Sequence, residues 1–175
     1  MTQDPIRLGV ISFAHGHIHR YLPEIATFDD AEVVVAWDAD TQRGQENAKK
    51  YDIEWEPDLD ALLARTDIDT VFITSPTHKH AEHCIAAAIA KKHILLQKPM
   101  SLTLEDCDAI INAVTTHGVK FSMCHQMRAD PINRKIKALL EEKAVGNIAI
   151  VRRRHAINVL LNPDFAHPDN WHLDP

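Results

Sequence analysis

The sequence lacks several features, and each absence excludes a class of protein. It has no excess of positive charge: the formal net charge is -6 and the pI is near 6.0. A nucleic-acid partner is therefore not expected, because neutralising phosphates requires a basic surface. No apolar run approaches the roughly 20 residues of a membrane span, and the start, MTQDPIRLG, has no basic segment followed by an apolar one. We expect a cytoplasmic protein that binds no membrane.

Cysteine is scarce and shows no pairing pattern. Cys84, Cys107 and Cys124 are odd in number and widely spaced, with no Cys-x-x-Cys. They are therefore interpreted as reduced core residues. At 175 residues, with 45% hydrophobic and 25% charged residues, the chain is long enough to bury a core and has the composition of a globular protein.

Short β-branched runs alternate with longer segments of helical period. The predicted strands are 6–12, 32–37, 70–74, 93–97 and 119–123, and the predicted helices are 16–28, 41–51, 58–64, 77–92, 104–117 and 132–143. Thr77 is the expected N-cap of the fourth helix. Parallel strands need crossovers, and crossover helices cover both faces of a sheet. The pattern predicts an α/β fold with a doubly wound parallel sheet, followed by a lone strand at 148–156 and a loop from Asn158 onwards.

Glycine is scarce where a dinucleotide-binding turn would lie. The loop after the first strand reads SFAHGHI, whereas the dinucleotide fingerprint is Gly-x-Gly-x-x-Gly. Its three glycine slots hold Ser12, Ala14 and His17, and Gly16 comes one place early. Ser12 and Ala14 are small enough for close backbone approach, and the helix that follows directs free N–H groups at an anion. His15 or His17 could add a donor to such a phosphate cradle, could touch the substrate, or could simply fill space.

Two groups of histidines raise the alternative of a metal site: His15, His17 and His19, and His78, His80 and His83. Alternate residues share a face only in an extended strand, so the first group should diverge in a loop that enters a helix. The second group has one i,i+3 pair but no carboxylate or thiolate companion. The sequence therefore favours no metal.

Asp38 stands at the end of the second strand, 38 − 16 = 22 residues beyond Gly16. This is close to the roughly 20-residue offset at which an acidic side chain accepts the ribose hydroxyls of an adenosine. A carboxylate there repels a 2′-phosphate, which favours NAD over NADP. The alternative is that Asp38 caps the next helix or occupies a turn.

Proline follows the ends of the next two strands, at Pro76 and Pro99. Because proline cannot donate to a sheet, each ends the hydrogen-bonded ladder and opens the edge. Lys98 is thereby placed at the carboxyl edge, where a lysine can stabilise an oxyanion or move a proton. The alternative is an ordinary solvated lysine.

Taken together, these residues resemble the Gfo/Idh/MocA family of glucose–fructose oxidoreductase and inositol dehydrogenase. The resemblance rests on LGVIS, VVAWDAD, the block from Asp67 to Ala113, HQMR, VGNI and WHLDP. It implies a Rossmann-type dinucleotide-binding domain over 1–124 and the start of an incomplete substrate domain over 125–175. It also implies an NAD-dependent dehydrogenase acting on a CH–OH or carbonyl group of a sugar, polyol or related small molecule. A non-catalytic dinucleotide-binding module is the alternative.

The resemblance assigns Lys98, in the Lys-Pro motif, as the catalytic residue. The expected cofactor-binding residues are Ser12, Phe13, Ala14, His15, Gly16, His17, Asp38, Ser75, Pro76, Thr77, His80, Gln97, Lys98, Pro99, Gln126 and Arg128. NAD is the expected cofactor, with NADP disfavoured by Asp38.

The sequence departs from the family pattern in three places. Gln97 replaces the glutamate usual before the Lys-Pro pair, which removes a charge beside Lys98. The glycine fingerprint is degraded. The chain ends at Pro175, before the glycine-rich helix start and the histidine that the family places near the transferred hydride. We expect a truncated product that is inactive alone, with a small-molecule substrate and homo-oligomerisation in the full-length form.

Overall fold

The computed structural model describes residues 4–154 and 156, and the chain forms two compact units, Met1–Cys124 and His125–Pro175. The first unit contains a six-stranded sheet in which every pair of neighbouring strands is parallel. The strands lie in the order β3-β2-β1-β4-β5-β6. Their bounds are β1 Ile6–Ile11, β2 Ala31–Trp37, β3 Glu54–Trp55, β4 Thr70–Ile73, β5 His93–Gln97 and β6 Phe121–Cys124. The predicted doubly wound parallel sheet is confirmed.

The helices of this unit follow the strands as crossovers. They are α1 Ile18–Ile25, α2 Thr41–Tyr51, α3 Leu59–Ala64, the 3-10 turn η1 Thr77–Lys79, α4 His80–Ile89 and α5 Leu104–His117. Side chains fix three of the helix starts, because Asp40, Asp58 and Thr103 each accept a hydrogen bond from the backbone N–H three residues later. Gly118 ends α5 in the left-handed conformation, with φ 67°.

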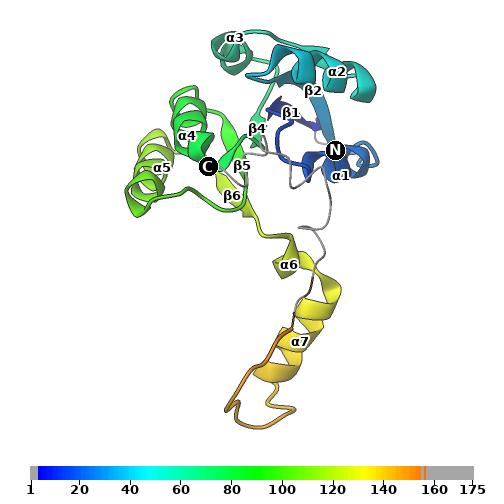
Figure 1. Ribbon diagram of the computed structural model, residues 1–175, viewed down its shortest axis with the longest axis vertical. Helices are drawn as coiled ribbons and strands as arrows, with labels where there is room; N and C mark the ends of the chain where they lie inside the picture. Colours follow the sequence, from blue (N-terminus) through cyan, green and yellow to red (C-terminus); the bar gives the residue numbers. More distant parts are fainter. Residues whose placement is uncertain (1–3, 155, 157–175) are drawn as a thin grey trace. The chain divides into compact units, whose positions relative to one another are not determined.

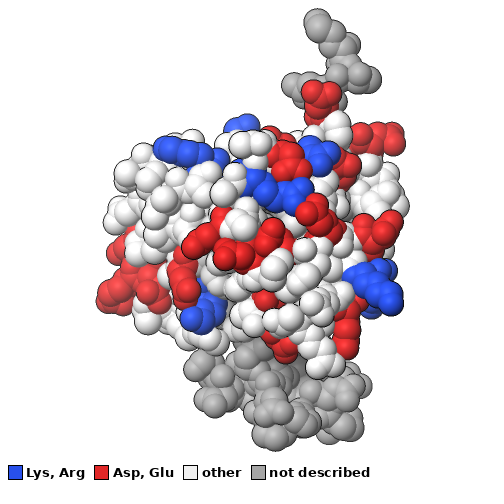
Figure 2. Space-filling model, turned by 90° about the horizontal axis from the view of Figure 1, so that it is seen from above, with Lys and Arg blue, Asp and Glu red and all other residues white. Residues whose placement is uncertain are grey.

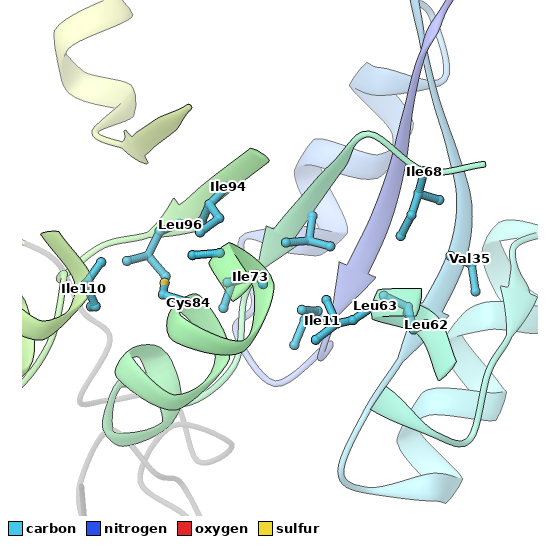
Figure 3. Packing of buried hydrophobic residues seen from close by; sticks show 13 residues of the cluster. Ile11, Val35, Leu62, Leu63, Ile68, Ile73, Cys84, Ile94, Leu96 and Ile110 are labelled. Atoms are coloured by element: carbon cyan, nitrogen blue, oxygen red, sulfur yellow. The ribbon is translucent and has the colours of Figure 1, made fainter. Parts of the chain in front are cut away.

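The sheet carries a hydrophobic layer on each face. One layer joins the strands to α3, α4 and α5 through residues that include Leu62, Cys84 and Ile110 (Figure 3). The other contains Ile18 and Leu22 of α1. Figure 1 shows α4 and α5 on one side of the strands and α1 on the other. The strands are therefore apolar on both faces, as parallel strands between two helix layers must be.

The structure corrects the sequence prediction at two places in the first unit. The two-residue strand β3 was not predicted, because so short a segment has no periodicity of its own. Thr77 is not a helix N-cap: it is the first residue of η1, and the capping position, Pro76, makes no side-chain hydrogen bond. The chain makes a tight 3-10 turn here, so α4 begins three residues later, at His80.

The second unit contains two described helices, α6 Gln126–Ala129 and α7 Pro131–Glu141. Asp130 accepts hydrogen bonds from the N–H groups of Ile132 and Asn133 at the start of α7. The strand predicted at 148–156 is wrong for its described part, because residues 148–154 and 156 have no regular structure. A strand requires a hydrogen-bonded neighbour, and the described residues of this unit provide none. The loop predicted from Asn158 onwards lies outside the described residues.

The surface carries charges of both signs. On the face shown in Figure 2, acidic side chains lie in several groups with basic side chains scattered among them, and there is no extended basic patch. Among residues 4–154 and 156, no helix has both the length and the apolar composition needed to cross a bilayer.

Candidate functional site

Four loops meet at the carboxyl edge of the sheet, because all the strands run in the same direction. They follow β1, β2, β4 and β5. The chain moves outward in opposite directions from the neighbouring strands β1 and β4, which makes this pair the switch point of the sheet. Ligands of open α/β sheets bind in the crevice outside such a switch point.

The loop after β1 begins with a strained residue. Ser12, in the first glycine slot of the fingerprint, has φ 74°, a left-handed conformation that favours glycine. Its N–H donates to Trp37 O at 2.7 Å, and the N–H of His15 donates to Thr74 O at 3.0 Å. The hydroxyl of Thr74 donates to Ser12 O. The loop is therefore tied to the ends of both β2 and β4.

Asp38 is buried at the end of β2 and organises this loop. Its Oδ2 accepts from the N–H of Phe13 at 2.7 Å and from the hydroxyl of Ser12 at 3.2 Å, while its Oδ1 accepts from the N–H of Asp40 at 2.9 Å. The α2 cap is Asp40 rather than Asp38. Asp38 is thus a turn-forming carboxylate, and its predicted contact with ribose stays a prediction.

Arg43 covers the same carboxylate and was not singled out from the sequence. Its Nε donates to Oδ2 of Asp38 at 2.9 Å and its Nη2 donates to Oδ1 at 2.6 Å, a two-point contact. The Asp38 side chain is 0% exposed, whereas that of Arg43 is 35% exposed. The sequence did contain a signal for this contact: Arg43 lies in the first turn of α2, the helix that follows Asp38 at the end of β2.

The loop after β4 is braced by two buried histidines. Nε2 of His80 lies 3.0 Å from Ser75 O, and its Nδ1 lies 2.8 Å from Pro99 O, so this ring connects the loops after β4 and β5. Nδ1 of His83 lies 2.9 Å from the hydroxyl of Ser75. Burial lowers the pKa of His80, against the opposing effect of the carbonyl oxygens, and burial lowers the pKa of His83 to about 4. Both rings are structural braces in this unit.

The end of β5 and the loop after it bring Gln97 and Lys98 to the crevice. Gln97 is fully buried, and its Nε2 lies 3.1 Å from Nδ1 of His17, in the loop after β1. Lys98 is half-buried and lies close enough to His17 to lower its pKa, although burial of the ring is the larger cause. Gln97 and Lys98 are thus neighbours of His17, which lies 80 or more positions earlier in the chain.

The remaining predicted residues are distributed as follows. Ala14 is half-buried and Gly16 is exposed in the loop after β1, and Pro76 and Thr77 begin the turn after β4. Phe13 packs its ring against Tyr51, with centroids 6.5 Å apart, so only its backbone belongs to the loop surface. Gln126 and Arg128 lie in α6 of the second unit, and their contact with cofactor and substrate stays a prediction.

The histidines of the first loop do not all diverge as predicted: His15 and His17 remain neighbours, and only His19 turns away. The rings of His15 and His17 have centroids 4.6 Å apart, whereas Nδ1 of His19 pairs with the hydroxyl of Tyr51 at 2.9 Å. Within the described part of the chain, no three His, Cys, Asp or Glu side chains are grouped as metal ligands.

The first loop fits a dinucleotide pyrophosphate. A Cβ added at Gly16 would meet no atom within 4 Å, so the backbone is open there. The N–H groups of Ala14 and His17 donate to nearby side chains, Ser12 Oγ and His15 Nδ1, both at 3.1 Å. An incoming anion can replace such local partners. The helix α1 begins directly after this loop, as anion-binding helices do.

A separate cavity of about 340 Å³ lies at the opposite, amino-terminal edge of the sheet. It is lined mainly by apolar side chains, including Leu8, Ile25, Ile94 and Phe121. Its polar lining residues, Thr70, His93, Lys120 and Ser122, stand at or near the starts of their strands, away from the loops at the carboxyl edge. The switch point, rather than this cavity, is therefore the candidate functional site.

Comparison with known proteins places the chain in a family. Residues 7–125 match the model of the GFO_IDH_MocA oxidoreductase family, described as an NAD-binding Rossmann fold. An inositol 2-dehydrogenase of Acidothermus cellulolyticus is 29% identical over 159 residues, which are 88% of this chain and 46% of the relative. A D-xylose 1-dehydrogenase [NADP(+)] of Haloarcula marismortui is 26% identical over 99% of this chain and 49% of its own length.

A solved structure gives the same result. The apo scyllo-inositol dehydrogenase of Lactobacillus casei superposes with a TM-score of 0.76 at 28% identity, over 85% of this chain and 45% of that protein. The chain thus spans about half the length of the relatives it matches. It belongs to the Gfo/Idh/MocA oxidoreductase family and carries that family's amino-terminal, NAD(P)-binding Rossmann part.

Proposed function

We propose that this chain is the cofactor-binding part of an NAD-dependent dehydrogenase that acts on a CH–OH or carbonyl group of a sugar, polyol or related small molecule. The observation that carries the proposal is the arrangement of the loop after β1, which Asp38 and Thr74 hold at the switch point with Gly16 open. When bound, the nicotinamide would supply the hydride acceptor or donor.

Each part of the crevice has a proposed task. The pyrophosphate lies over the backbone of Ser12 to Gly16, at the start of α1. Lys98, half-buried at the end of β5, contacts the substrate oxygen and holds or moves its proton. The buried rings of His80 and His83 keep the loops after β4 and β5 in position around it.

The preference for NAD rests on Asp38. Ribose hydroxyls donate to a carboxylate, whereas a 2′-phosphate is repelled by it. In the described structure Arg43 occupies the exposed side of this carboxylate. Binding of an adenosine ribose therefore requires the guanidinium to move aside, and the same cation is the natural partner of a 2′-phosphate. The balance between these two side chains sets the preference between NADH and NADPH.

The proposed substrate class follows from the relatives, which include dehydrogenases of inositol and D-xylose. These substrates share adjacent carbinol carbons on a small ring or chain. Residues beyond the first unit select among them in this proposal, because the described crevice supplies mainly cofactor contacts.

Titration of the 175-residue chain with NADH and NADPH, followed by cofactor fluorescence, tests the proposal. We expect saturable binding with NADH tighter than NADPH, and at least tenfold weaker NADH binding in Asp38→Ala. Asp40→Ala is the matched control. It removes the same negative charge two residues away, but Asp40 is an exposed residue that caps α2.

Two outcomes oppose the proposal. Unchanged NADH affinity in Asp38→Ala, with the fold intact by circular dichroism, would remove the ribose assignment. Tighter binding of NADPH than of NADH would assign Arg43 to a 2′-phosphate and reverse the cofactor preference.

A further inference from the structure

The side chain of Gln97 connects two loops of the crevice through a defined set of hydrogen bonds. Its Oε1 accepts from the backbone N–H of Lys98 at 2.8 Å. A backbone N–H can only donate, so the carbonyl end of the amide faces Lys98. The NH₂ end is then the group 3.1 Å from Nδ1 of His17. Because Gln97 is fully buried, water does not compete for these two hydrogen bonds of its side-chain amide.

This orientation determines where the proton of His17 resides. An amide NH₂ can only donate, so Nδ1 of His17 must accept and carry no hydrogen. The proton of the neutral ring is then on Nε2. The described residues form no hydrogen bond with this Nε2, which leaves it available as a donor at the head of α1.

The surroundings of His17 also favour its neutral form. Burial lowers the pKa of His17, and the positive charges of Lys98 and Arg20 lower it further. The other groups around the ring carry no opposing negative charge: the ring of His15 lies with its centroid 4.6 Å away, and that of Tyr21 lies edge-on at 6.0 Å. A second proton would in any case have to enter at Nδ1, where it would meet the NH₂ of Gln97.

We propose that Gln97 is a positioning residue that fixes His17 as a neutral Nε2–H donor for a pyrophosphate oxygen of the bound dinucleotide. The proposal rests on the proposed function for its ligand, but the tautomer itself is a property of the chain without cofactor. It also gives Gln97 a task that its isosteric acid cannot perform, because a carboxylate would accept from Nδ1–H and draw a proton to that nitrogen.

Long-range ¹H–¹⁵N NMR spectra of the cofactor-free chain test the tautomer directly, with His17→Gln used to assign the ring. We expect His17 to be protonated on Nε2 alone near pH 7. In Gln97→Glu the proton should appear on Nδ1 and the pKa of His17 should rise. Gln45→Glu adds the same charge on the exposed face of α2 and should change neither. A wild-type ring protonated on Nδ1, or an unchanged ring in Gln97→Glu, would overturn the proposal.

NADH binding tests the consequence for the cofactor. We expect about tenfold weaker binding in His17→Ala, as for the loss of one hydrogen bond to a charged group. Gln97→Met keeps the volume but removes the NH₂, and it should weaken binding alone but add nothing to His17→Ala. Fully additive losses would mean that Gln97 acts without His17, and unchanged binding in His17→Ala would mean that His17 does not contact the cofactor.

The two proposals fail in different ways. Absence of NADH binding to the wild-type chain contradicts the cofactor-binding function and removes the ligand of His17. NADH binding together with an Nδ1-protonated His17 contradicts only the role given to Gln97. If circular dichroism shows that Gln97→Met does not fold, the tautomer of His17 in the wild-type chain alone decides whether Gln97 has the proposed role.

Discussion

Both carboxylate oxygens of Asp38 are bound by the guanidinium of Arg43, with Oδ1–Nη2 and Oδ2–Nε distances of 2.6 and 2.9 Å. The same carboxylate holds the N–H of Phe13 in the loop after β1. One buried anion therefore ties the start of α2 to the loop after β1. Any change in this pair should alter both the stability of the unit and the shape of the crevice.

We predict that Arg43→Gln lowers the free energy of unfolding by about 1–2 kcal/mol, because it leaves a buried carboxylate with fewer donors. The loss stays below the usual cost for a fully buried pair, since Arg43 is partly exposed and Asp38 keeps its backbone partners. Urea denaturation measures it. Arg20→Gln, which alters an exposed arginine of α1, should differ from wild type by less than about 0.5 kcal/mol. Equal effects of the two variants would contradict the structural role of the pair.

Gly44 is predicted to be intolerant of a methyl group. A Cβ there would lie 2.1 Å from the Trp55 ring and 3.0 Å from Cβ of Asp38. Gly44→Ala should therefore destabilise the unit by about 1–3 kcal/mol through overpacking, despite the gain of about 1 kcal/mol in helix propensity. Thermal unfolding of the variant provides the measurement. A Tm equal to or above that of wild type would show that α2 and β3 do not pack as described.

Gly16 should show the opposite pattern, since it lies in open space. We expect Gly16→Val to leave the unfolding temperature within about 2 °C of wild type, as surface changes usually do. The added side chain would fill the space proposed for the pyrophosphate, so NADH binding should weaken at least tenfold. Binding of wild-type strength in a stable Gly16→Val chain would place the cofactor elsewhere.

Buried neutral histidines should make the unit sensitive to acid. Burial lowers the pKa of His83 to about 4 in the folded chain, whereas the ordinary value is 6.5. Between these two values the unfolded chain binds more protons, so the free energy of unfolding falls as the pH falls through that window. His83 alone can account for up to about 3 kcal/mol.

The variant His83→Gln measures this contribution. Its free energy of unfolding should depend less on pH between 6.5 and 4 than that of wild type, although the lowered pKa values of His17, His19 and His80 leave a residual slope. His78→Gln is the matched control, since His78 is exposed in η1, directly before the helix α4 that contains His83. If the free energy of unfolding depended on pH equally in His83→Gln and wild type, His83 would not be a source of the acid sensitivity.

Local patterns in the sequence were sufficient to predict most of the fold. The bounds of α2, β5 and α5 agree with the predicted segments because each has a clear period and a capping or turn residue at its ends. The segments that were missed or wrong have no such signal. β3 is two residues long, and the segment 148–156 was alternating enough to suggest a strand but has no described neighbour to pair with.

The candidate site was predictable in its location but not in its pairings. Strand order placed the residues after β1, β2, β4 and β5 at one edge, as the alternation of elements indicated. The contact between His17 and Gln97 joins residues 80 positions apart. The ion pair between Arg43 and Asp38 likewise depends on how the side chains pack, and the spacing of residues in the sequence does not predict it.

Backbone amide NMR during titration of the chain with NADH tests the central claim most directly. The account predicts saturable shift changes concentrated in the loops after β1, β2, β4 and β5, above all from Ser12 to Ile18. The opposite edge of the sheet, around Leu8, Thr70 and Phe121, should show no shift changes although it contains a cavity of about 340 Å³. Saturable changes centred on that opposite edge, or no saturable change at all, would contradict a cofactor site at the switch point.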